Sequence, residues 1–282
     1  MTRYLAVSCL CLGVAVAQPT VQAPRAGCLR GVDGALRPVQ GIAGALLAGA
    51  PAQSGVIAAA CSDSLALVKT ASALEVRDGT LALLARWDSP AGTALFALPR
   101  GAETGFAYYP ATGELVQVSA QAAPRVVTTA QALGGNVLAM ASPDSSHLVA
   151  VVADTSAPRL VQISSDGAIE SQVPFNDPIP LALLGDGTLI FADGAALVIR
   201  PPGPAVQRFS PPAGRAPRVP PLTARPASTE RRLELPAAAL AIDQMSGAWL
   251  AVRLADGSAP LAMRLEGASE RTCRIPTLEA AQ

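Results

Sequence analysis

This sequence is poor in the side chains that most enzyme chemistry requires. Histidine occurs once, at His147, and lysine once, at Lys69. A metal site made of several histidines is therefore excluded, and any Ser-His-Asp triad would have to use His147. The chain also lacks a Gly-x-Ser-x-Gly elbow, a Gly-x-Gly-x-x-Gly loop, a phosphate-binding loop and an EF-hand series. We therefore expect no catalytic residue, no cofactor and no metal ligand.

Aromatic residues and excess charge are scarce as well. Aromatic side chains make up 4% of the chain, and 21 basic residues balance 21 acidic ones. Without a basic stripe, nucleic acid is an improbable partner. Sugar-binding proteins usually offer flat rings, for which the candidates are Trp87, Tyr108, Tyr109 and Trp249. We expect these rings to pack in the core.

No apolar run is long enough to span a bilayer, and the one at the amino end has the features of a secretory leader. Arg3 supplies a positive charge, residues 5–14 are mainly apolar, and Ala15-Val16-Ala17 offers small residues at a cleavage site. This pattern predicts a signal peptide over residues 1–17, cleaved after Ala17. The mature chain is then expected in the periplasm or outside the cell, with no membrane span.

Short apolar runs recur in groups of four, separated by turns rich in Asp, Gly, Pro and Ser. The first run of each group begins near residues 56, 94, 136, 180 and 237. Asp-Gly turns such as Asp78-Gly79 and Asp193-Gly194 are typical of tight hairpins. A four-stranded sheet every 40 to 45 residues is the spacing of β-propellers. We therefore predict an all-β propeller of five or six four-stranded blades, in which the run 36–39 could complete the last sheet.

One segment carries a more specific signal. Ala141-Ser142-Pro143-Asp144-Ser145-Ser146-His147-Leu148 resembles the Ser-Pro-Asp-Gly-x-x-Leu repeat of WD-like propellers and of the periplasmic Tol-system propeller. Ser145 stands where that repeat has glycine. The resemblance implies a fold and not an activity.

The domain boundaries follow from the repeat. We predict an extension over 18–35, the propeller over 36–277 and a short tail over 278–282. Residues 201–226 are rich in proline and arginine, and we interpret them as an insertion between the fourth and fifth groups.

Three cysteines remain after cleavage, and an exported chain favours their pairing. Cys28 and Cys273 lie near opposite ends of the mature chain. A disulfide between them would close the ring, which is the pairing we predict, although one of the three cysteines must stay unpaired or leave the molecule. Cys61 ends an apolar run and is expected to be a small buried side chain.

An acidic residue lies in or beside the first turn of every group. In a ring these residues would share one rim, and they are Asp63, Glu103, Asp144, Asp186 and Asp243. Two readings are open: a carboxylate ring that binds a cation or cuts glycosidic bonds, and turn chemistry repeated because the unit repeats.

The function that we predict is a non-enzymatic, monomeric interaction or scaffold module whose partner is a protein or envelope component. The alternative is a carboxylate-dependent glycosidase, lyase or lactonase with its site in the central channel. A chiefly structural role in an envelope assembly is a third possibility.

Overall fold

The computed structural model describes the larger part of the chain. The described residues are 24–42, 45–99, 101, 103–153, 157–177, 182–185, 187–200, 231–246, 249–264 and 271–275, of which 271–273 are described for the backbone alone. The predicted leader 1–17, Asp186, the insertion 201–226 and the tail 278–282 lie outside them.

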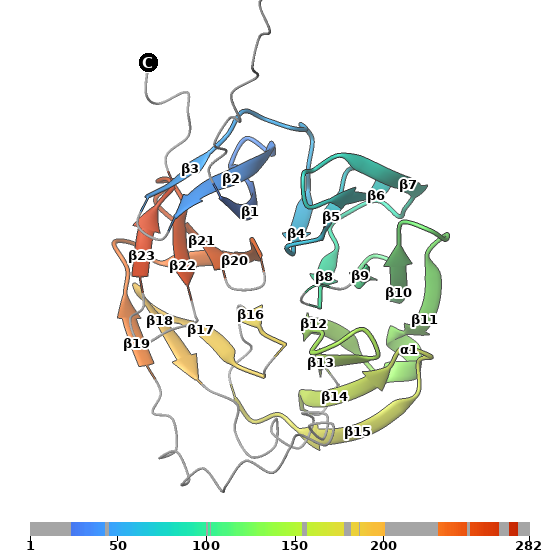
Figure 1. Cartoon of the computed structure of the whole chain (residues 1–282). Coiled ribbons are helices and arrows are strands. Elements are labelled where there is room, and N and C mark those ends of the chain that lie inside the picture. The colour runs from blue at the N-terminus through green and yellow to red at the C-terminus, as the bar shows by residue number, and fades with distance from the viewer. Residues whose placement is uncertain are drawn as a thin grey trace, which may run out of the picture.

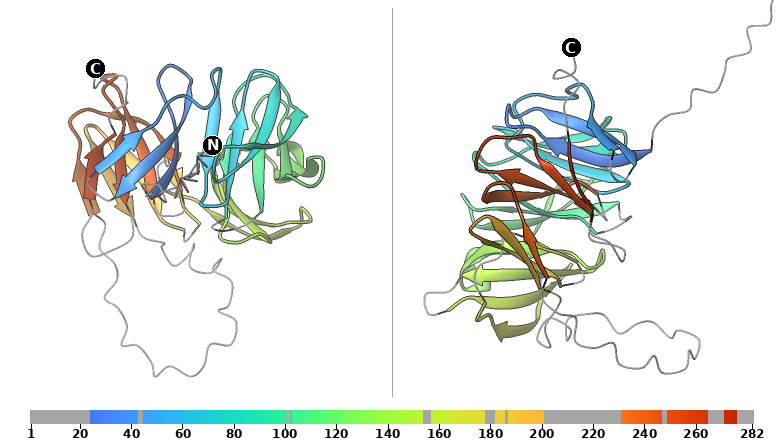
Figure 2. Two further views of the ribbon diagram at one scale, coloured as in Figure 1. Left: turned by 45° about the horizontal axis from the view of Figure 1, so that its top comes forward. Right: turned by 90° about the vertical axis from the view of Figure 1, so that its left-hand side faces the viewer.

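The described strands form six antiparallel sheets arranged around a central axis (Figure 1). Each sheet uses consecutive strands, and the first strand of each lies nearest the axis. Seen from the side, many strands run across the ring from one rim to the other (Figure 2). The fold is therefore a six-bladed β-propeller, at the upper end of the predicted range.

The first three sheets come from the amino-terminal half of the chain. Sheet 1 has three strands and sheets 2 and 3 have four each: β1 (Arg25–Arg30), β2 (Leu36–Ile42) and β3 (Ala45–Ala48); β4 (Ala58–Cys61), β5 (Leu65–Lys69), β6 (Ala73–Asp78) and β7 (Leu83–Asp88); β8 (Leu95–Ala97), β9 (Thr104–Tyr109), β10 (Glu114–Ser119) and β11 (Arg125–Thr129).

The next three sheets have four strands each. They are β12 (Asn136–Ala141), β13 (His147–Ala153), β14 (Arg159–Ser164) and β15 (Ile169–Pro174); β16 (Ala182–Leu183), β17 (Leu189–Asp193), β18 (Ala196–Arg200) and β19 (Arg231–Glu234); β20 (Ala239–Gln244), β21 (Trp249–Leu254), β22 (Leu261–Arg264) and β23 (Arg271–Arg274). A short helix, α1 (Ala130–Leu133), precedes sheet 4, and no helix within the described ranges is long and apolar enough to cross a bilayer.

The alternating strand direction gives the ring two distinct rims. The turn after the first strand and the turn after the third strand of a sheet lie on one rim, which we call the first-turn rim. The turn after the second strand and the connection to the next sheet lie on the other, which we call the second-turn rim. Side chains near the start of a fourth strand therefore also lie toward the first-turn rim. Sheet 1 is the exception, because its three strands run in the opposite sense. Its β1–β2 turn lies beside Val56 on the second-turn rim, and its β2–β3 turn lies toward the first-turn rim.

The hydrophobic core is divided among the interfaces between neighbouring sheets. Six clusters of buried apolar side chains occur, one at each interface around the ring, including the one where sheet 6 meets sheet 1. Five of them hold ten to twelve buried residues among those described, whereas the cluster between sheets 1 and 2 holds seven. Because each sheet buries its faces only against its neighbours, the stability of every sheet depends on closure of the ring.

The ring closes where β1 meets sheet 6, and Gly27 makes this contact possible. Cys28 donates its backbone N–H to the Met245 carbonyl at 3.2 Å. Gly27 has φ +118°, and a Cβ at this position would lie 1.8 Å from the Met245 oxygen. No other residue type fits this backbone conformation and this close approach.

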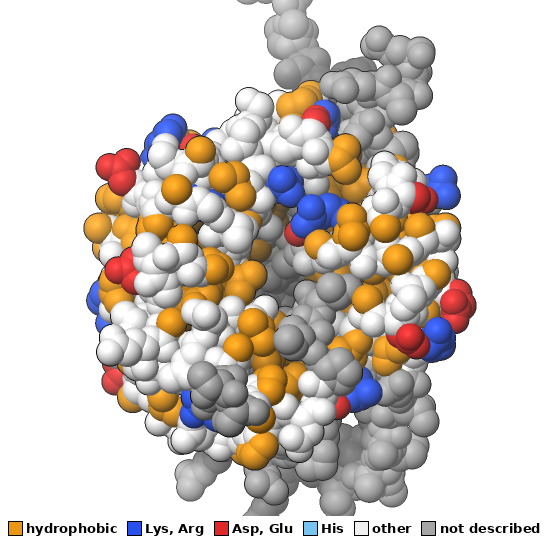
Figure 3. Space-filling model, turned by 180° about the vertical axis from the view of Figure 1, so that it is seen from behind, with side chains coloured by type: hydrophobic (Ala, Val, Ile, Leu, Met, Phe, Trp, Pro, Cys, Tyr) orange, Lys and Arg blue, Asp and Glu red, His pale blue; other side chains and the backbone are white. Residues whose placement is uncertain are grey.

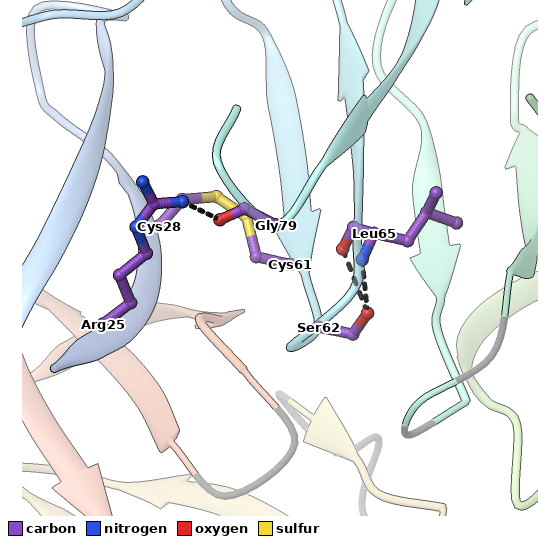
Figure 4. Close-up of a disulfide and its surroundings, with 6 residues drawn as sticks. All are labelled: Arg25, Cys28, Cys61, Ser62, Leu65 and Gly79. Carbon is purple, nitrogen blue, oxygen red and sulfur yellow. Dashed lines mark hydrogen bonds between the residues drawn. A yellow bond between two sulfur atoms is a disulfide. The ribbon is translucent and has the colours of Figure 1, made fainter. Parts of the chain in front are cut away.

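The interface between sheets 1 and 2 contains a disulfide, which corrects the predicted pairing. Cys28 on β1 is bonded to Cys61 on β4, with their Cα atoms 5.9 Å apart (Figure 4). The predicted Cys28–Cys273 bridge is therefore wrong. Sheets 1 and 2 adjoin in the ring, so Cys61 faces Cys28, whereas Cys273 lies on β23, the fourth strand of sheet 6. Cys61 is buried as expected, but as a half-cystine.

Two strand predictions also need correction. The segment containing 36–39 does not complete the last sheet, because it forms β2 and pairs with β1, which lies inside the predicted extension 18–35. The proline-rich segment does not separate two sheets. It falls inside sheet 5, whose fourth strand is β19 and pairs with β18. The strand predicted over 206–209 lies outside the described residues.

We expect Gly27→Ala to lower the free energy of unfolding by more than about 2 kcal/mol, since the new methyl group would collide with the Met245 carbonyl. Thermal and denaturant unfolding measure this effect. Gly55→Ala is the matched control, because Gly55 also has positive φ (+70°) but has nothing within 4 Å of the added Cβ. Equal losses of unfolding free energy in the two variants would contradict the role of Gly27 in closing the ring.

Candidate functional site

The axis of the ring contains a cavity of about 400 Å³. Its wall is made by the first strands of five sheets and the residues that follow them, and much of it is alanine, including Ala58, Ala139 and Ala182. One face of the ring is hollowed at its centre, and hydrophobic side chains with a few charged ones border the hollow (Figure 3). Small side chains on the innermost strands thus leave the axis open instead of filling it.

Asp243 on β20 is the one acidic residue among the described residues of this wall. Burial raises its pKa above the usual range, an effect that the guanidiniums of Arg253 and Arg30 oppose. The Arg253 Nε lies 2.8 Å from Asp243 Oδ2, and the Arg253 Nη2 donates to Oδ1 at 3.3 Å. Arg253 follows on β21, where strand pairing places both side chains on one face of the sheet.

Sequence reasoning found Asp243 but missed its partner and its neighbour. Gln244, the next residue, donates from Nε2 to the Leu98 carbonyl at 3.4 Å, which connects sheet 6 to sheet 3 beside the cavity. The alternation of side chains along β21 could have indicated that Arg253 lies on the same face of the sheet as Asp243. Nothing in the sequence indicates the contact with Leu98, because the two residues are distant in the chain and meet only in the closed ring.

The other described rim carboxylates do not join Asp243. Asp63, Glu103 and Asp144 lie in turns after the first strands of sheets 2, 3 and 4, and Asp63 and Glu103 are exposed. These three therefore share the first-turn rim, as expected, whereas Asp243 lies within a strand on the wall of the channel. No group of three or more His, Cys, Asp and Glu residues suited to a metal occurs among the described residues.

Asp144 organises the turn that carries the propeller-like motif. Its Oδ1 accepts backbone N–H groups from Ser146 at 2.7 Å and His147 at 2.9 Å, and the His147 Nδ1 lies 2.9 Å from the same oxygen. Burial opposes ionisation of Asp144, but the Ser146 N–H and His147 outweigh it and hold the pKa of the carboxyl below its usual range. The His147 Nε2 lies 3.7 Å from Glu170 Oε1 on β15. This pattern is an Asx turn, consistent with the reading as repeated turn chemistry.

The tyrosine pair lies in the core, as expected. Tyr108 and Tyr109 are buried between sheets, and burial raises the pKa of Tyr109 to about 12. Trp87 packs partly buried between sheets 2 and 3. Trp249 also joins an apolar cluster, yet its residue lines the cavity, so it is the one candidate ring beside the channel among the four.

One comparison with a solved structure supports the propeller fold. The chain is similar to a chain in a crystal structure of a nidogen/laminin complex, with a TM-score of 0.53 and 15% identity over 90% of this chain and 93% of that one. It is also similar to the WD40 domain of Neurospora crassa Pan2, at 10% identity over 78% and 66% of the two chains, with a TM-score of 0.46. Kluyveromyces lactis Hsv2p matches at 10% identity over 86% and 79%, with a TM-score of 0.42. No family model and no curated protein matches the sequence.

The lowered pKa of Asp144 gives a signed pH dependence. Its ionised form is favoured in the folded state, so its contribution to stability is present above the unfolded pKa of 3.8 and is lost as the pH falls through the folded value. We expect Asp144→Asn to lower the free energy of unfolding by about 0.5–1 kcal/mol at pH 7, and we expect the difference from the native chain to shrink in acid. Denaturant unfolding at pH 7 and at pH 3 measures it. A difference that grows in acid would contradict the assignment.

Proposed function

We propose that this protein is an exported, non-enzymatic β-propeller that binds a protein or envelope component through its first-turn rim. The observation that carries the proposal is where its exposed apolar side chains lie. Of the eight large hydrophobic residues that are exposed in the described chain, five lie toward this rim: Ile42, Leu83, Leu84, Val126 and Ile169. Exposed apolar side chains gathered on one face are typical of interaction surfaces.

The charge of the same rim favours a particular kind of partner. Acidic residues occur in its turns at Asp63, Glu103, Asp144 and Asp166, and the described residues of these turns include no lysine or arginine. A partner that presents basic and apolar groups would complement this rim. The nidogen neighbour comes from a complex with laminin, which agrees with a propeller in a binding role, although the likeness is one of fold.

The site geometry gives less support to the enzyme alternative. Glycoside hydrolysis uses two carboxyl groups roughly 5 to 10 Å apart. The described wall of the channel offers Asp243 alone, already engaged with Arg253. The exposed carboxylates of the first-turn rim belong to separate sheets and lie in turns.

Site-specific photocrosslinking in the native host tests the proposed surface. A benzoylphenylalanine introduced at Ile42, Val126 or Ile169 is expected to give an adduct with one common partner, since these side chains lie on the proposed contact face. Val32 and Leu240 are the matched controls, because they are 77% and 64% exposed but lie toward the second-turn rim. Equal labelling from both rims, or none from the first-turn rim, would overturn the proposal.

Export is proposed from the leader and is supported by the disulfide, because disulfides persist mainly in oxidising compartments. In a Gram-negative host, the full chain is expected in the periplasm with Gln18 as its first residue. Mass analysis after alkylation without reductant should find Cys28 joined to Cys61. Leu10→Asp, which charges the apolar stretch, should keep the chain in the cytoplasm, whereas Thr20→Asp should not. Cytoplasmic retention of the native chain would refute export.

A further inference from the structure

The channel cavity has the dimensions and composition of a small-molecule site. Pockets for small molecules typically measure 300 to 1,000 Å³ and combine an apolar wall with a few polar groups. This cavity measures about 400 Å³, and its wall combines apolar side chains, among them Ala58, Phe96 and Leu138, with polar surface in nearly equal share. The surrounding strands belong to a closed ring of packed sheets, so the cavity is held open by the fold itself.

The wall remains open because of specific residues. Ala58 is half-buried on β4, lines the cavity and belongs to none of the six apolar clusters. Ala58 therefore borders the channel and is not one of the side chains that form the apolar clusters between sheets. A larger residue at this position would occupy the cavity and leave the packing between sheets intact.

The polar groups at the wall define the charge of the ligand. Asp243 is paired with Arg253, and the charge of Arg30 also acts on it. A cationic ligand would therefore gain little, since the carboxylate is already compensated by two guanidiniums. An anionic ligand would be repelled by the carboxylate of Asp243. The Gln244 amide is engaged by the Leu98 carbonyl, which leaves the Asp243 carboxylate as the acidic hydrogen-bond acceptor of the described wall.

We propose that the channel binds one uncharged small molecule with an apolar ring system that donates a hydroxyl or N–H hydrogen bond to Asp243. The apolar side chains of the wall contact the ring system, and the carboxylate fixes its orientation. The wall of the site includes first-turn residues such as Ser142 and Pro143, so the site adjoins the first-turn rim. The dye is tested on the isolated chain, so its binding there does not depend on the proposed partner.

The uncharged dye N-phenyl-1-naphthylamine, which carries one N–H group and fluoresces strongly in apolar surroundings, is a suitable probe. Titration into the purified mature protein is expected to give saturable fluorescence with one dye bound per chain. In Trp87→Phe the remaining tryptophan is Trp249, beside the cavity, and excitation of Trp249 should transfer energy to the bound dye. Fluorescence that does not saturate, or the absence of energy transfer, would overturn the proposal.

Two comparisons locate the dye and test the hydrogen bond. Ala58→Phe should weaken binding at least tenfold, and the smaller change Ala58→Leu should weaken it less, because each fills part of the cavity. Ala45→Phe, at an exposed position on β3, should bind as the native chain does. The competitor 1-benzylnaphthalene, which has CH₂ in place of N–H, should bind about three- to tenfold more weakly than the dye.

Each comparison has an outcome that overturns the proposal. Unchanged binding in both Ala58 variants would place the dye outside the channel, and circular dichroism identifies the variants that fold. Equal affinity for the dye and for 1-benzylnaphthalene would refute the hydrogen bond. A failure of these tests leaves the crosslinking result at the rim unaffected, so the two proposals are decided separately.

Discussion

Closure of the ring is the constraint on which the rest of this structure depends. Every sheet buries its apolar side chains against two neighbours, and an open row of sheets would leave the outer faces of two of them in water. Many propellers join their ends by sharing a sheet between the two termini. Here each sheet is built from consecutive strands, so the closing contact is made by packing of side chains and by the backbone approach of Gly27 to Met245.

Strand β1 is connected to both of its neighbours, and Cys28 takes part in both connections. Its N–H bonds to sheet 6, and its sulfur bonds to Cys61 of sheet 2. The disulfide lies in the interface with the fewest buried apolar residues among the described parts of the six. Arg25 adds a further contact there by donating to the Gly79 carbonyl at 2.8 Å (Figure 4). A covalent bond thus supplements the interface where apolar packing is smallest, and by constraining the unfolded chain it contributes about 2–4 kcal/mol.

The same ring separates two kinds of surface. The rims carry turns, whose residues are chosen by backbone geometry and exposed to solvent, and they suit contacts with a large partner. The channel is lined by the innermost strands, where alanine leaves space and Asp243 is partly shielded from water. The protein-binding and small-molecule proposals therefore rest on different residues and different physical features, although both depend on the rigidity of the closed ring.

The strands were largely predictable because turns and alternation are local properties of the chain. The strands over 136–141, 147–153 and 249–254 lie where the pattern of apolar residues predicts them. The errors occur where the answer depends on distant contacts. Cys28 has two possible partners by composition, and the choice of Cys61 follows from which sheets are neighbours.

The candidate site likewise has features that the sequence predicts and features that depend on contacts between distant residues. The repeated acidic turn residues are visible in the sequence, and their common rim follows from strand alternation. The displacement of Asp243 from that rim into the channel wall, and its pairing with Arg253, follow from the register of β20 against β21. The sequence by itself therefore determined the repeat, the strands and the turn residues, because these depend on neighbours along the chain. Only the tertiary structure decided the number of blades, the disulfide partner and the channel, because these depend on how six sheets fit around one axis.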